Sequence, residues 1–202
     1  MRGGVVDVVK LEPYIDLPFL MTGVWSRFGV HLFHGRVTTD DIDRIERDGD
    51  AWLAKHPGRT VELVVIYPSG ARMSTSERMR FARLLKRHEK NRAATATVIL
   101  AEGLTGAVHR SVLTALLRLA PPPHPVKVFG STREAVTWLA PHVAALCGPR
   151  ATVEALVAAV DEMCARFKSR LSGTASASSP SSALTREGTR SARRSRAGAR
   201  CP

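Results

Sequence analysis

The fold is decided by the stretch VELVVIYPSGARMSTSERMRFARLLKRHEKNR, residues 61–92. Its first part, residues 61–67, is the most β-branched run in the chain and predicts a strand buried on both faces, ended by a Pro-Ser-Gly turn. Ser74 and Glu77 have the spacing of a capping box, so we expect a helix from Ser74 to about Arg92. The hydroxyls at this helix start should lie beyond the carboxyl edge of a sheet, where ligands and partners usually meet an open α/β fold.

The rest of the chain alternates between strand and helix patterns. A β-hairpin is predicted at residues 19–34, and an ambiguous run at 5–11 fits a short edge strand. The further predicted elements are helices at 38–55, 104–119 and 131–143 and strands at 95–100 and 125–129. The order ββαβαβαβα calls for crossover connections. We therefore expect an α/β fold with a mixed, largely parallel sheet, an N-terminal β-hairpin and helices that cover the sheet.

The helix predicted at residues 104–119 carries large apolar side chains at helical spacing. A stripe of this kind usually packs on the core of its own domain. We therefore expect its members to face inward, namely Leu104, Val108, Val112, Leu116 and Leu119.

The pattern divides the chain into four segments. These are an N-terminal lead at residues 1–18, the α/β domain at 19–147, a C-terminal amphipathic helix at 148–172 and an Arg-rich tail at 173–202. The apolar stripe of the C-terminal helix, residues 152–171, fits packing on its own domain, and its spacing also fits a homodimer through a short coiled coil. The tail has lost all periodicity, and its composition predicts disorder.

Composition sets the class of partner and of compartment. The net charge of +12 in 202 residues favours acidic partners, which include acidic proteins, nucleic acid and anionic membranes. Charged residues interrupt the N-terminus, so no signal peptide is expected, and no apolar run approaches the roughly 18 residues of a membrane span. The expected location is the cytoplasm. The three cysteines lack the spacing of a metal or redox motif.

Motifs for catalysis, nucleotide binding and metal binding are missing from the sequence. It contains no glycine-rich phosphate loop and no nucleophile elbow. His31 and His34, three residues apart on a strand, should point to opposite faces and cannot share a metal ion. We therefore expect no enzyme, no cofactor and no metal. A small-molecule or lipid carrier with a site near Ser69, Glu102 and Gly103 stays an alternative.

Three hydroxyl residues open the helix at Ser74. Ser74, Thr75 and Ser76 are helix-capping residues in the first place. They are also candidate phospho-acceptors, because a phosphate there would lie at the positive end of the helix dipole beside several arginines.

The same helix carries a basic stripe opposite its apolar face. Like charges at this spacing repel each other by a few tenths of a kcal/mol per pair. That cost is tolerable on a solvated face and would be repaid if an acidic protein or a phosphate backbone docked there. The candidate partner-binding residues are Arg80, Arg83, Arg87 and Lys90.

A family resemblance covers roughly residues 19–143. The stretches that carry it are LRLAPPP at 117–123, VF at 128–129 and EAVTWL at 134–139. The chain resembles the STAS fold of anti-sigma factor antagonists and, more closely, the uncharacterised bacterial single-domain proteins grouped as STAS/SEC14-like. In STAS antagonists this helix start carries a phosphorylated serine in an Asp-Ser-Ser/Gly-Gly type motif. Here MSTSE at 73–77 keeps the hydroxyls and lacks the Asp and the Gly.

The resemblance implies a non-enzymatic, regulatory module that binds a protein partner, and the net charge of +12 favours an acidic one. It does not name that partner. The alternatives are a nucleic-acid-associated basic protein and a carrier of a lipid or other small molecule, as the related lipid-carrying fold would imply.

Overall fold

The computed structural model describes residues 9–101 and 103–177, apart from the side chains of 69–71 and 174–177. One mixed sheet has the strand order β1-β2-β3-β4-β5-β6. The first three strands pair in antiparallel fashion, and β3 to β6 run parallel. The predicted α/β fold with its N-terminal hairpin is confirmed. The strands are Glu12–Leu17, Leu20–Trp25, Phe28–Arg36, Thr60–Arg72, Arg92–Ile99 and Val126–Phe129.

Strand β1 is an addition to the predicted order. It lies at residues 12–17, whereas the edge strand was expected at 5–11, of which residues 5–8 are outside the described part. Pro13 lies in β1 next to a register shift. Proline lacks an N–H, but an edge strand has one side that needs no ladder bond. The edge position therefore accommodates a residue that sequence patterns exclude from strands.

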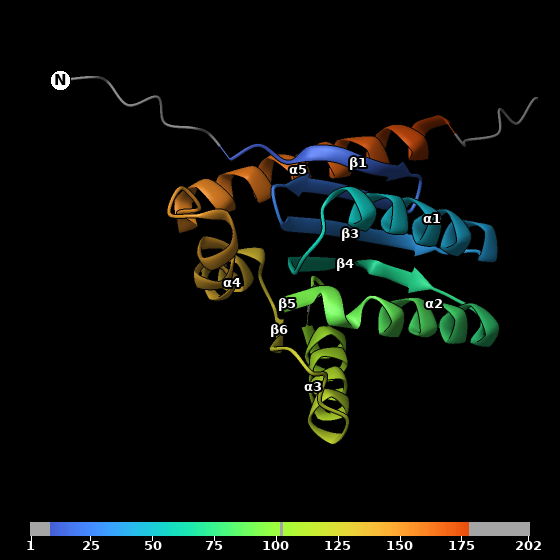
Figure 1. Cartoon of the computed structure of the whole chain (residues 1–202). Coiled ribbons are helices and arrows are strands. Elements are labelled where there is room, and N and C mark those ends of the chain that lie inside the picture. The colour runs from blue at the N-terminus through green and yellow to red at the C-terminus, as the bar shows by residue number, and fades with distance from the viewer. Residues whose placement is uncertain (1–8, 102, 178–202) are drawn as a thin grey trace, which may run out of the picture.

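Helices cover both faces of the sheet (Figure 1). Helices α1 and α2 share a small core with β1 to β3, which includes Leu20, Phe33, Ile42 and Leu84. Helices α4 and α5 share the larger core on the other face. The helices are α1 (Thr39–Lys55), α2 (Thr75–Arg87), α3 (Gly103–Leu119), α4 (Thr132–Cys147) and α5 (Val153–Ala177).

The central strand β4 is buried unequally on its two faces. Val61, Leu63 and Val65 are fully buried towards α4 and α5, while Glu62 and Val64 on the other face are only half-buried. The strand also continues past Pro68 to Arg72, beyond its predicted end. Both faces are covered by helices, and the face that carries α4 and α5 is the more deeply buried of the two.

Helix α5 packs on its own domain. Leu156, Val160 and Phe167 are completely buried in the larger core. A Cβ at Gly23 of β2 would lie 2.7 Å from the sulfur of Met163, so glycine permits this close approach. The homodimer through residues 152–171 stays a prediction, and it would need this apolar stripe to leave the sheet.

Two predicted boundaries are wrong. Helix α5 continues to Ala177, so residues 173–177 belong to it and not to the tail, while 178–202 lie outside the described residues. Helix α2 ends at Arg87, and a 3₁₀ turn (Glu89–Asn91) follows and carries Lys90.

The predicted inward stripe of α3 is also wrong. Helix α3 lies at the β6 edge of the sheet (Figure 1), and all five of its large stripe residues are exposed. Its inner face is instead narrow and partly polar, with Gly106 as its buried residue. None of the helices in the described residues is long and apolar enough to cross a membrane.

Candidate functional site at the start of α2

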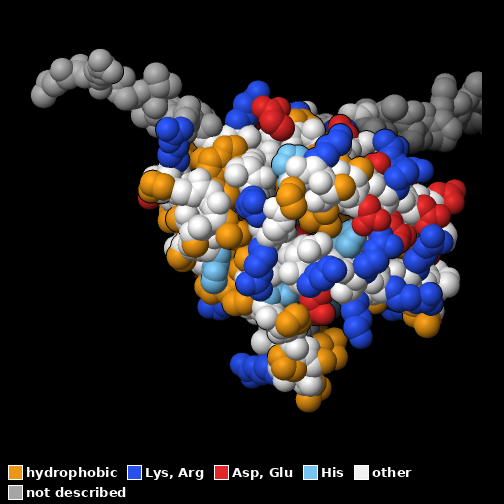
Figure 2. All heavy atoms as spheres, in the orientation of Figure 1, with side chains coloured by type: hydrophobic (Ala, Val, Ile, Leu, Met, Phe, Trp, Pro, Cys, Tyr) orange, Lys and Arg blue, Asp and Glu red, His pale blue; other side chains and the backbone are white. Residues whose placement is uncertain are grey.

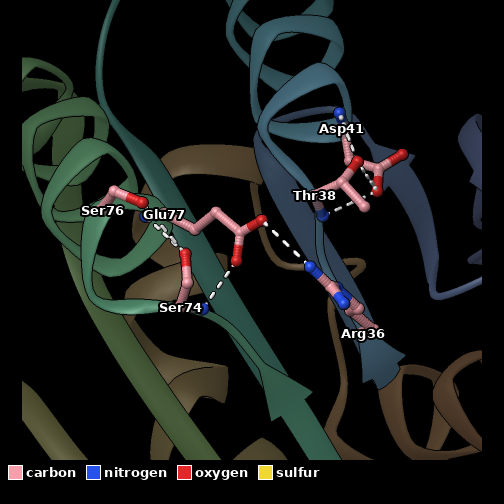
Figure 3. Close-up of polar contacts among 6 residues, drawn as sticks. All are labelled: Arg36, Thr38, Asp41, Ser74, Ser76 and Glu77. Atoms are coloured by element: carbon pink, nitrogen blue, oxygen red, sulfur yellow. Dashed lines mark hydrogen bonds and ion pairs between the residues drawn. The ribbon is translucent and has the colours of Figure 1, made fainter. Parts of the chain in front are cut away.

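Two capping boxes lie next to each other where the parallel strands β3 and β4 end (Figure 3). In α2, the Glu77 N–H donates to Ser74 Oγ at 3.3 Å, and the Ser74 N–H donates to Glu77 Oε2 at 2.6 Å. In α1, the Asp41 N–H donates to Thr38 Oγ1, and the Thr38 N–H donates to Asp41 Oδ2 at 2.8 Å. Each helix therefore begins with two backbone N–H groups satisfied by its own side chains, that of the capping residue and that of the third helical residue. The predicted cap at Ser74 is confirmed.

Glu77 ties the two helix starts together. It is buried, and its Oε1 lies 3.8 Å from the Arg36 guanidinium at the end of β3. Hydrogen bonds from Ser74, first from its backbone, hold the pKa of Glu77 below its ordinary value. A carboxylate thus occupies the positive end of the α2 dipole, which is the place where an anion would otherwise bind.

The three hydroxyls have different surroundings, although all three residues are exposed. Ser74 Oγ serves as the cap and also lies 3.1 Å from Ser76 Oγ. Thr75 accepts a hydrogen bond from Arg78 at 3.3 Å. Ser76 lines a surface groove of about 470 Å³ between α1 and α2. Of the three candidate phospho-acceptors, Ser76 is the one in that groove.

Ion pairs with α1 neutralise half of the predicted basic stripe. Arg80 pairs with Asp43, and Arg87 pairs with Asp50 and, at 2.6 Å, with Glu46. His88 adds a contact of 2.7 Å to Asp50. Burial raises the pKa of Asp50, but hydrogen bonds from Arg87 and His88 outweigh it and bring the pKa below its ordinary value.

The remaining two cations of the stripe are available. Arg83 and Lys90 are exposed and form no ion pair with the described residues. Arg83 lines the groove together with Ser76, Arg80 and Arg87. Figure 2 shows basic and acidic side chains intermixed over α1 and α2, so this face is not uniformly basic.

The carboxylates of α1 are the functional neighbours that sequence reasoning missed. Asp43, Glu46 and Asp50 recur at intervals of three and four residues, which places them on one face of α1. This spacing was a usable signal for a helix that pairs with a basic stripe. What it did not reveal was which helix would lie opposite.

A half-buried polar cluster holds the far end of α2. Arg92 Nε donates to Glu62 Oε2 at 2.6 Å, and its Nη1 donates to the Leu85 carbonyl at 2.9 Å. Burial raises the pKa of Glu62, but Arg92 outweighs that effect and brings it below its ordinary value. His31 Nδ1 lies 3.1 Å from Thr22 Oγ1, and burial lowers the pKa of this histidine. The cluster fixes α2 on the sheet.

Two further kinds of site were considered in the sequence, a metal site and a carrier site. The described residues contain no group of three or more histidine, cysteine or acidic side chains that could hold a metal ion. Glu102 and the Ser69 side chain, part of the alternative carrier site, lie outside the described residues.

Comparisons with known proteins concern the fold. No protein-family model matches the chain, and no curated protein matches it. One solved structure is similar, that of an uncharacterized protein from the DUF3478 family with a SpoIIAA-like fold from Shewanella loihica PV-4. The match has 18% identity and a TM-score of 0.49, and it covers 62% of this chain and 97% of that chain. A SpoIIAA-like fold is a STAS fold, the one that the sequence resembles, and so distant a likeness says nothing of function.

Proposed function

We propose that the chain is a non-enzymatic, STAS-like regulatory module that binds an acidic protein partner through α2. The observation that carries this proposal is the groove between α1 and α2, which is lined by both Ser76 and Arg83. Both lie on the helix that begins at the carboxyl edge of the sheet, the usual place for recognition in such folds.

The available charge determines what the partner should carry. Arg80 and Arg87 are engaged with α1, so a partner would have to displace their carboxylates. Arg83 and Lys90 are exposed and free of such competition. A docking protein would therefore present carboxylates to these two residues. Charge complementarity of this kind determines the specificity and the association rate more than the affinity.

Phosphorylation of Ser76 would act on the same surface. A phosphate adds nearly two negative charges, and at Ser76 it would lie in the first turn of α2 beside Arg80 and Arg83. It would compete with an acidic partner for Arg83. Ser74 is less suited, because its Oγ is the cap of the helix.

Charge reversal at the two available cations tests the proposal. The variant Arg83→Glu with Lys90→Glu should keep its fold and lose its partner when the tagged chain is purified from its own cells and retained proteins are quantified by mass spectrometry. Binding should fall by about tenfold or more. The matched control, Arg133→Glu with Arg166→Glu, changes charge by the same amount at exposed positions on α4 and α5. Equal recovery of the partner with both variants would contradict the proposal.

A nucleic-acid-associated role is the second candidate. The net charge of +12 favours it. It predicts nucleic-acid binding that weakens steeply with salt and falls when residues 178–202 are removed. An affinity for a labelled duplex that does not change with salt concentration, measured by fluorescence anisotropy, would exclude this nucleic-acid-associated role.

A further inference from the structure

Helix α3 turns its apolar stripe away from the protein. Leu104, Val108, Val112, Leu116 and Leu119 are between 49% and 83% exposed. Figure 2 shows hydrophobic side chains gathered over α3 at the bottom of the view. Single exposed apolar residues are ordinary, but a contiguous stripe along a whole helix is typical of an interaction surface.

The outward orientation of α3 is built into its inner face. Gly106 is buried against the residues that follow β5, and a Cβ there would overlap the Ala101 carbonyl. Arg110 reaches back, and its Nη1 donates to the carbonyls of Ile99 at 3.1 Å and Ala101 at 3.3 Å. Rotating the stripe inward would break both contacts. The contacts therefore hold the stripe away from the core of its own domain.

The stripe has the spacing of a helix-pairing seam. Val108, Val112, Ala115 and Leu119 follow one another at intervals of four, three and four residues, and Leu104 and Leu116 flank them. This is the spacing of knobs-into-holes packing. With 17 residues, α3 presents about 25 Å of such a seam. A second helix is therefore the shape that fits it.

The charges beside the seam are all basic on α3. Residues 103–119 contain no aspartate or glutamate, and Arg118 and His109 are exposed at the flanks of the seam. An open hollow of about 730 Å³ adjoins the helix and is lined by Arg110, Arg118, Phe129 and Glu134, among others. Lys127 lies 5.3 Å from the ring centroid of Phe129. Flanking charges of this kind select the partner helix by opposite charge.

The same charges disfavour two other partners for the apolar stripe of α3, a second copy of this chain and a lipid surface. A second copy of this chain would bring Arg118 again and no carboxylate on its own α3. A lipid surface is best bound by a helix with aromatic residues and many lysines or arginines along it. Helix α3 has no aromatic side chain other than His109, and of its two arginines Arg118 is exposed and Arg110 is partly buried.

We propose that α3 is a docking surface for an amphipathic helix of a partner protein that carries glutamate or aspartate beside an apolar seam. The partner's leucine, isoleucine or valine side chains cover Val108, Val112 and Leu119. Its carboxylates pair with Arg118, which lies beside the seam and lines the hollow. This surface is separate from α2 and does not depend on the function proposed for that helix.

Two synthetic peptides test the proposal on the full chain. Both are three heptads long with leucine at the a and d positions, and they differ only in carrying glutamate or lysine at e and g. The expected result by isothermal titration calorimetry is that the glutamate peptide binds about tenfold more tightly than the lysine peptide. Arg118→Glu should remove or reverse this preference.

Two seam variants test where the peptide binds. Val112→Lys and Leu116→Lys should each abolish binding, and since both positions are exposed, the melting temperature should not change. Equal affinity for the two peptides, or binding that survives both lysine variants, would overturn the proposal. So would self-association in sedimentation velocity that Val112→Lys abolishes. Binding to vesicles of phosphatidylcholine and phosphatidylserine that Val112→Lys abolishes, without any peptide preference, would also overturn it.

Discussion

Helices α2 and α3 each follow a parallel strand and each carry a stripe of large apolar side chains, yet the stripes face in opposite directions. Leu84 of α2 is 6% exposed, and Phe81 contacts Phe33 edge-to-face at 6.1 Å. Leu116 of α3, with the same kind of spacing, is 57% exposed. Helical periodicity therefore identifies a stripe but not what covers it.

The reason for the difference lies in the neighbours of each helix. Helix α2 lies beside α1, which supplies carboxylates for its cations and an apolar residue, Ile42, for the shared core. Helix α3 lies at the sheet edge beside β6 and is attached through Gly106 and Arg110. A helix becomes part of the core only when its neighbours offer apolar surface.

The largest expected difference between the helices comes from truncating one leucine in each. Leu84→Ala should lower the free energy of unfolding by about 2–4 kcal/mol, because it removes buried methyl groups and leaves a cavity. Leu116→Ala should change it by less than about 0.5 kcal/mol. Urea denaturation of both variants measures the two values. Comparable losses would mean that α3 packs inward.

The next effect separates the hydroxyls of the α2 start. Ser74→Ala should cost about 1 kcal/mol, because the Glu77 N–H loses its cap. Ser76→Ala should be nearly neutral, since Ser76 caps no backbone group among the described residues. Thermal unfolding of the two variants compares them under identical conditions, and equal losses would contradict the assignment of Ser74 as the cap.

A smaller effect concerns the ion pairs between α1 and α2. A double-mutant cycle of Arg87→Ala and Asp50→Ala should give a coupling of about 0.5 kcal/mol, because both side chains are about half exposed. The matched cycle of Arg83→Ala and Asp50→Ala should give a coupling of about zero. A coupling for Arg83 as large as that for Arg87 would show that α1 and α2 pair through other side chains than these.

The smallest effect is the pH dependence of that coupling. The pKa of Asp50 lies below its ordinary value of 3.8 in the folded chain. The stabilisation is therefore complete above the ordinary value and is lost as the pH falls through the folded pKa. Repeating the cycle at about pH 3 should give a smaller coupling than at neutral pH. A coupling that is larger at about pH 3 than at neutral pH would contradict this prediction.

Sequence patterns predicted those elements whose signal is local. The β-branched run at 61–67, the hairpin at 19–34 and the capping box at Ser74 each depend on residues close in the chain, and the structure contains all three. Strand β1 was missed because Pro13 opposes a strand, and its edge position is known only once the sheet is assembled.

The candidate site was predicted less completely than the fold. The hydroxyls and the basic stripe follow from the spacing of residues in one helix. The pairing of Arg80 and Arg87 with α1 depends on the packing of two helices, with over thirty residues between the partners. For α3, the direction of the stripe depends on Gly106 and Arg110, whose contacts with Ala101 no periodicity reveals.

Hydroxyl-radical footprinting with mass spectrometry tests the central claim most directly, because it reports the solvent accessibility of individual side chains. In the purified chain we expect rapid oxidation of Leu104, Leu116 and Leu119, and protection of Leu84 and Ile42. Protection of Leu116 and Leu119 to the same degree as Leu84 would contradict the account, because the apolar face of α3 would then be covered by the chain itself.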